Sequence, residues 1–88
     1  MKEQALPPDP KLTVLAPLLD MLPPIIARKQ VKYFTGGLLT SKKVSNDDFL
    51  GKGPKVRVKV GSAVGYPKAH FLAYMESLGV NVIVPPSF

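Results

Sequence analysis

The 88-residue sequence contains no cysteine and only one histidine, His70. Without cysteine the chain cannot form a disulfide, bind zinc through a thiolate or use a thiolate as a nucleophile. A single histidine also excludes a metal site built from several imidazoles. We therefore expect no metal and no cofactor, and the absence of cysteine agrees with a cytoplasmic location.

Long hydrophobic runs are missing as well. The most apolar stretch, residues 12–27, is interrupted by Asp20 and by prolines, so it does not reach the roughly 20 apolar residues that span a membrane. Acidic residues precede it and no small-residue cleavage motif follows it, which argues against a signal peptide. We expect no membrane partner.

Motifs that indicate catalysis are absent too. The sequence has no Ser–His–acid or paired-carboxylate motif, and its glycines lack the spacing of Walker or dinucleotide-binding loops. We predict that the protein is not an enzyme and has no small-molecule substrate.

Acidic residues are scarce: six Asp and Glu stand against twelve Lys and Arg, which gives a formal net charge of +6. After residue 24 the imbalance grows to ten basic residues against three acidic ones. A small domain this basic favours a polyanionic partner, and double-stranded DNA is the first candidate. The basic residues are spread over several predicted elements, which disfavours a basic amphipathic helix at a membrane surface.

Proline is concentrated in residues 1–24, which contain six of the ten prolines. Since proline fixes φ and lacks a backbone donor, we expect an extended segment over 6–10 and a short helix over 17–22. We interpret 1–24 as a Pro-rich N-terminal arm that covers the core, with a self-association element as the alternative. Residues 80–88 contain a β-branched run and are predicted to form an extended C-terminal tail that pairs within the chain or with a second copy.

A first short helix is predicted over residues 27–34. Its apolar side chains follow the i, i+4, i+7 spacing of one helix face: Ala27, Val31 and Phe34. Glycine tolerates the left-handed conformation that ends helices, so Gly36 and Gly37 are expected to end this one. The two leucines that follow, Leu38 and Leu39, are expected to be buried in the turn.

A second helix is predicted from Ser41 to about Leu50. Thr40 is a suitable N-cap, because its hydroxyl can accept a hydrogen bond from a free amide of the first turn. Val44 is the inward-facing residue of this helix, and the GKGP sequence at 51–54 ends it.

Residues 55–66 have the alternation of a β-hairpin, with valines at 56, 58 and 60 between cations at 55, 57 and 59. A two-residue turn over 61–62 would leave Val64 and Tyr66 on the cationic face. A three-residue turn over 61–63 would put all the apolar residues on the core face and the cations on the solvent face. We predict the three-residue turn, because the buried face sets the register of a strand pair.

A last helix is predicted to begin at Pro67 and to end at Gly79. Its core stripe has the spacing i, i+3, i+4, i+7: Phe71, Tyr74, Met75 and Leu78. Aromatic residues with this spacing are expected to lie in the core rather than to stack on bases. His70 is expected at the surface or its boundary.

Two helices joined by a glycine-containing turn, a basic two-stranded wing and a packing helix make a winged helix-turn-helix. We therefore predict a fold that is mainly α with a small β-hairpin, in one domain over residues 25–79. The order of the segments resembles the excisionase-like, MerR-type helix-turn-helix domains of phages, prophages and small regulators. The resemblance covers residues 27–78 and rests on four sequences: ARKQV, TGGLLTSKKVSN, GKGP and VRVKVGSAVGYPKAHFLAYM.

The chain departs from this family at three places. Ala27 replaces the usual Ser or Thr cap of the first helix, which costs about 1 kcal/mol of capping. Asp47 and Asp48 stand where a hydrophobic residue usually follows the inward valine by one turn. Ser62 and Ala63 stand at the wing tip, where family members often carry arginines.

The second helix is the expected reader of the major groove, which is wide enough to admit one helix. Asn46 is the candidate for adenine, since an amide can bond that base bidentately, whereas lysines can contact guanine or phosphate. The candidate DNA-binding residues of this helix are Lys42, Lys43, Ser45 and Asn46. Asp47 and Asp48 would repel phosphate if they faced the groove, and we expect them to form ion pairs with Lys43 or Lys52.

Contacts to phosphate position a protein beside the groove. We expect the wing to supply them through Arg57, Lys59 and Ser62, and the start of the first helix through Arg28 and Lys29. Together these residues predict sequence-specific binding of double-stranded DNA by an excisionase-like protein or a small transcription regulator, with a recombinase or a second copy as a further partner. The alternative is a protein-interaction or self-assembly module on a winged-helix fold that has lost DNA binding, because a fold does not fix a function.

Overall fold

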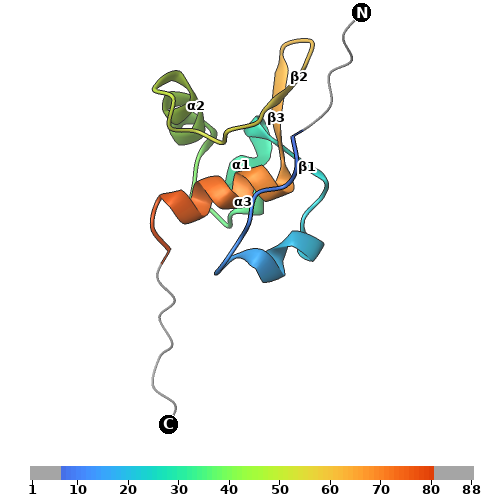
Figure 1. Ribbon diagram of the computed structural model, residues 1–88. Helices are drawn as coiled ribbons and strands as arrows, with labels where there is room; N and C mark the ends of the chain where they lie inside the picture. The colour runs from blue at the N-terminus through green and yellow to red at the C-terminus, as the bar shows by residue number, and fades with distance from the viewer. Residues whose placement is uncertain (1–6, 81–88) are drawn as a thin grey trace, which may run out of the picture.

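A three-stranded antiparallel sheet joins the two halves of the chain in the computed structural model, which describes residues 7–80 (Figure 1). Its strands are β1 (Ile25–Ala27), β2 (Val58–Val60) and β3 (Ala63–Pro67), in the order β1-β3-β2. The prediction of a two-stranded sheet is therefore wrong. The third strand forms because Ile26 is β-branched and pairs with Tyr66, where both side chains are fully buried.

Helices surround this sheet: the 3₁₀ helices η1 (Ala16–Met21) and η2 (Arg28–Gln30), and the α-helices α1 (Val31–Phe34), α2 (Ser41–Phe49) and α3 (Lys68–Ser77). In Figure 1, α2 and the β2–β3 hairpin rise on one side of α3, whereas η1 lies on the other. The chain is thus a small fold of helices and one antiparallel sheet. None of the helices within residues 7–80 has the length and apolar character needed to cross a membrane.

The first helix is shorter than the predicted 27–34. Ala27 belongs to β1, where it pairs with Gly65, and the next three residues form η2 before the α-helical turn of α1. As predicted, Gly36 and Gly37 follow its end, with φ of 62° and 90°, and both amides donate to α1 carbonyls. The two leucines differ from each other: Leu39 packs against the core, but Leu38 is 81% exposed, so its predicted burial is wrong.

The second helix agrees with its prediction at both ends. The Thr40 hydroxyl accepts a hydrogen bond from the Lys43 amide at 3.1 Å and caps α2. Val44 is fully buried, and Gly51, with φ of 76°, follows the last turn. Local signals therefore determine this helix.

The hairpin has the two-residue turn, not the predicted three-residue one. Val60 pairs with Ala63 and Lys59 with Val64, so the turn is Gly61-Ser62. Glycine with positive φ in the first turn position matches the twist of the strands, and Gly61 has φ of 61°. From the hairpin, only Tyr66 and Val64 of β3 pack into the core. β2 is an edge strand, and its valines remain outside the core.

This register reverses the faces assigned to the hairpin. Lys59 shares a face with Val64, which packs against the core, whereas Val58 and Val60 lie on the opposite face. Val60 is 74% exposed, so the expectation that the valines face the core is wrong. The cationic face of the hairpin is turned toward the core and α2.

The last helix packs on the sheet through more residues than its predicted stripe. Phe71 and Tyr74 are buried and Met75 is partly buried, as expected, but Leu78 is exposed. His70, expected near the surface, is buried at 8% exposure. The buried core cluster consists of side chains from β1, β3 and the three α-helices: Ile26, Val31, Val44, Tyr66, Phe71 and Tyr74.

The N-terminal arm lies against α3. The Glu76 carboxylate accepts hydrogen bonds from the backbone amides of Thr13, at 2.9 Å, and Leu15, at 2.8 Å. The bond from the Leu15 amide is the main cause that lowers the pKa of Glu76. This contact is what an arm covering the core would make, and the self-association alternative stays a prediction. The expected helix at 17–22 is the 3₁₀ helix η1, and the tail predicted over 80–88 lies outside the described residues except for Val80.

We expect Thr40→Ala to lower the free energy of unfolding by about 1 kcal/mol, because the Lys43 amide loses its acceptor. Thr40→Ser should keep most of the native stability, since serine caps equally well. Urea unfolding followed by circular dichroism measures both. Equal stability of the alanine and serine variants would show that the cap does not stabilise α2.

Candidate nucleic-acid interface

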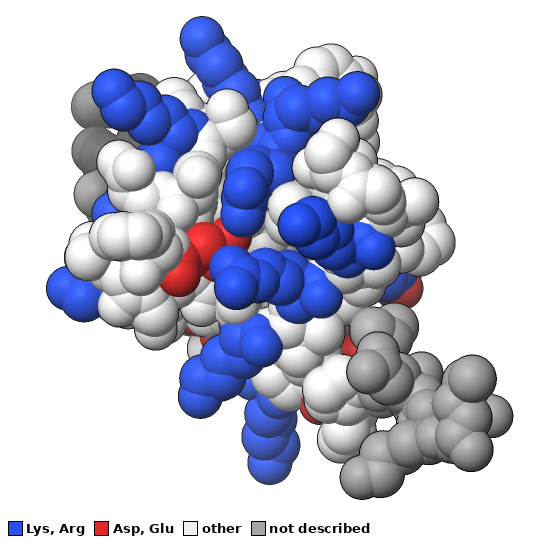
Figure 2. All heavy atoms as spheres, turned by 90° about the horizontal axis from the view of Figure 1, so that it is seen from above, with Lys and Arg blue, Asp and Glu red and all other residues white. Residues whose placement is uncertain are grey.

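Cations gather on the side of the molecule that carries α2 and the β2–β3 hairpin. Figure 2 shows this side with Lys and Arg side chains spread around a small acidic patch. We call it the basic face and define it by the exposed cations of α2, the hairpin and the loop between them: Lys42, Lys43, Lys52, Lys55, Arg57 and Lys59. Such a face attracts polyanions.

The predicted α2 residues occupy two positions around the helix. Lys42 and Asn46 are exposed and one turn apart, so they share one outer stripe. Phe49 continues that stripe and is 90% exposed. Lys43 is exposed but donates to Asp47, and Ser45 is half-buried. The outer stripe of α2 therefore carries an amide, a cation and an aromatic ring.

The wing residues lie beside this helix. Lys59 is exposed, and Ser62 stands in the hairpin turn. Ser62 also lines a hollow of about 400 Å³ together with Lys29 of η2 and Ser41 at the start of α2. The structure thus brings together the predicted residues Lys29 and Ser62, which are far apart in sequence, near the amino end of α2.

Arg28 also lines this hollow, but its guanidinium is paired within the protein. Its Nε donates to the Tyr66 hydroxyl at 2.9 Å and its Nη2 lies 2.6 Å from the Asp48 carboxylate. The hydrogen bond with Tyr66 is the main cause that raises the pKa of Arg28. Its guanidinium is held by an internal ion pair with Asp48, the Arg28 side chain is 26% exposed, and its contact with phosphate stays a prediction.

Asp48 is the acceptor that organises this region. Its carboxylate is almost fully buried and accepts from the Tyr66 hydroxyl at 2.5 Å and from Arg28 at 2.6 Å, while Arg57 approaches to 3.7 Å. We call these four residues the Asp48 cluster. Burial is the main cause that raises the pKa of Tyr66 to about 12, so its hydroxyl remains protonated and donates.

Asp47 is held in the same manner. Its carboxylate accepts from the Tyr74 hydroxyl at 2.6 Å and lies 3.1 Å from the Lys43 amine, one turn away. The hydrogen bond from Tyr74 is the main cause that lowers the pKa of Asp47. The predicted pair with Lys43 is confirmed. The partners of Asp48 were not foreseen, because they come from η2, β3 and the loop before β2.

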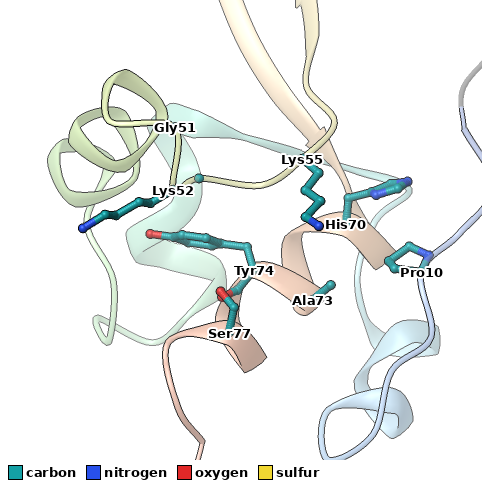
Figure 3. A pocket seen from close by; sticks show the side chains of 9 residues that line it. Pro10, Gly51, Lys52, Lys55, His70, Ala73, Tyr74 and Ser77 are labelled. Carbon is teal, nitrogen blue, oxygen red and sulfur yellow. The ribbon is translucent and has the colours of Figure 1, made fainter.

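A second hollow lies on another side, between the 51–55 loop and α3. It measures about 410 Å³ and is lined by cationic, hydroxyl and aromatic side chains, among them Lys55, His70, Tyr74 and Ser77. Figure 3 shows Lys55 reaching toward α3, while Lys52 points away. The buried Nε2 atom of His70 has no hydrogen-bond partner within the described residues. In residues 7–80, no three His, Asp or Glu side chains are grouped so as to hold a metal ion.

Comparison of the chain with protein-family models, with curated proteins and with solved structures found no match in any of the three. The function is therefore inferred from the residues of the basic face and their arrangement.

We expect Tyr74→Phe to raise the pKa of Asp47 toward its ordinary value of 3.8, because the carboxylate loses a donor. In the native protein the ionised Asp47 stabilises the fold above its unfolded pKa, and this stabilisation is lost as the pH falls through the lower folded pKa. The variant should therefore lose less stability than the native protein between neutral pH and about pH 3.

Urea unfolding at several pH values and an NMR titration of the Asp47 carboxyl carbon measure this difference. Tyr33→Phe is the control, because Tyr33 is 80% exposed. An unchanged Asp47 titration in Tyr74→Phe would contradict the assignment.

Proposed function

We propose that the protein binds double-stranded DNA sequence-specifically, with α2 in the major groove and the β2–β3 hairpin as a wing on the phosphate backbone. The observation that carries the proposal is the hairpin register. Because the turn has two residues, Lys59 lies on the hairpin face that is turned toward α2. The helix and the wing therefore present their cations to the same side of the molecule, as one duplex would require.

The outer stripe of α2 suits the major groove. Asn46 can bond the edge of adenine, and Lys42 can reach guanine or a phosphate. The two aspartates of this helix are buried and paired, so they do not face a duplex as free charges. Because both carboxylates are already paired, they would repel DNA phosphates less when this helix lies in a groove.

The biological role within this proposal is that of an excisionase-like protein or a small transcription regulator. Both roles need a small domain that binds defined sites, and the family resemblance supports both. A recombinase or a second copy on a neighbouring site is the expected protein partner.

Exposed apolar side chains support the alternative function, a protein-interaction module. Phe49 and Leu50 are 90% and 61% exposed at the end of α2, and Val60 is 74% exposed on the hairpin. Apolar side chains at such positions suit a protein surface better than a phosphate backbone. Charge reversal of Lys42 and Lys43 on α2 distinguishes the two functions. It should weaken DNA binding through repulsion of the phosphates, and it should leave contacts between apolar surfaces intact.

We expect Lys42→Glu/Lys43→Glu to weaken binding to a random-sequence duplex at least about tenfold at low salt, since two cations near phosphate become anions. Fluorescence anisotropy at several salt concentrations, with duplexes of random sequence and from upstream of the gene, measures the affinities and the salt slope. Lys11→Glu/Lys68→Glu changes the net charge equally outside the basic face and should have a much smaller effect. No binding of the folded native protein to either duplex would exclude the proposed function in favour of the alternative.

Asn46→Ala tests base recognition separately. We expect it to reduce the preference for a specific site over random duplex by about 1–3 kcal/mol, while the salt slope stays unchanged, because no phosphate contact is removed. Gln30→Ala, which removes an exposed side-chain amide outside the basic face, is the matched control. An unchanged preference in Asn46→Ala would show that this amide does not contact a base.

A further inference from the structure

A small hollow of about 230 Å³ lies beside the Asp48 cluster, at the start of the wing. Three charged side chains line it, Asp48, Lys55 and Arg57, together with the backbone of the 51–54 loop. Both cations are exposed, whereas the Asp48 side chain is only 4% exposed. The Lys55 amine reaches toward α3 (Figure 3), so the accessible cation beside the recessed Asp48 carboxylate is Arg57.

The two arginines of the cluster are held very differently. Arg28 lies 2.6 Å from the Asp48 carboxylate, whereas Arg57 lies 3.7 Å away and its side chain is 56% exposed. A separation of 3.7 Å is too long for a strong hydrogen bond, so Arg57 is attracted to Asp48 without being fixed by it. Arg57 is the member of the cluster that can exchange its partner.

Asp48 itself cannot move away to make room. The Tyr66 hydroxyl and Arg28 hold its carboxylate from the side of the core. On the other side the loop packs so closely that a Cβ at Gly53 would clash with the Asp48 side chain. The carboxylate therefore stays beside Arg57.

Lys and Arg side chains bind phosphate oxygens through charge-assisted hydrogen bonds. We infer that Arg57 makes a backbone-phosphate contact at the start of the wing, and that Asp48 is its internal competitor. The inference rests on the proposed function, and it makes Asp48 the residue that determines how strongly Arg57 binds DNA. A bound phosphate has to draw Arg57 from Asp48, so this site contributes little to binding of an arbitrary duplex. Asp48 thereby favours sites where other contacts, such as those of α2, supply the affinity.

The test is the affinity of the full-length chain for a random-sequence duplex, measured by fluorescence anisotropy at several salt concentrations. Asp48→Asn should bind about two- to fivefold more tightly at low salt, since Arg57 is released from an exposed ion pair. Its salt slope should steepen by about 0.9, the value for one added phosphate contact. Asp20→Asn removes the same charge from the exposed N-terminal arm, outside the hollow, and should give a smaller gain.

A double-mutant cycle shows whether the gain comes from Arg57. In Asp48→Asn/Arg57→Gln the excess gain over Asp20→Asn should disappear, because the released cation is absent. Equal gains in Asp20→Asn and Asp48→Asn, or a gain that persists without Arg57, would overturn the inference while leaving DNA binding intact. Binding by neither the native protein nor Asp48→Asn would overturn the proposed function and the inference with it.

A second comparison avoids altering the buried carboxylate and so does not depend on the folding of Asp48→Asn. In the native background, Arg57→Gln should weaken duplex binding less than Lys59→Gln does, because Arg57 is partly neutralised by Asp48. Lys59 is the matched control, two residues along the same hairpin face. A larger loss in Arg57→Gln would contradict competition by Asp48. Circular dichroism establishes that each variant is folded.

Discussion

Two consecutive aspartates hold α2 in place, and every candidate base-reading side chain depends on where that helix lies. Asp47 binds the Tyr74 hydroxyl of α3, and Asp48 binds the Tyr66 hydroxyl of β3. Neighbouring residues on an α-helix point about 100° apart, so the two bonds fix both the position and the rotation of α2. Helix α2 has nine residues and buries one apolar side chain, Val44, so packing alone could not fix its position and rotation.

The same bonds explain how a strongly basic surface contains two acids. A buried carboxylate costs free energy unless donors and an opposite charge surround it. Each aspartate has one phenol and at least one cation as partners, so neither is an unpaired negative charge on this face. The small acidic patch in Figure 2 is surrounded by cations and by exposed apolar side chains.

Local sequence signals were sufficient where the structure is local. The cap at Thr40 and the glycines after α1 and α2 act within a few residues of the chain, and α2 agrees with its prediction. The hairpin turn was predicted wrongly because alternating valines suggested one buried face, whereas β2 is an edge strand. The third strand could not be predicted from periodicity, and neither could the hydrogen bonds from Tyr66 and Arg28 to Asp48, which join residues 18 and 20 positions apart.

The N-terminal arm is attached to α3 through Glu76, and this attachment affects how the protein unfolds locally. None of the residues of η1 is fully buried, and the central core contains no side chain from the arm. Regions with few buried contacts open with a lower free energy than the rest of a protein. The arm is thus an outer layer that touches the core through Leu22, and we expect it to open by local unfolding at a lower free energy than the sheet, α2 and α3.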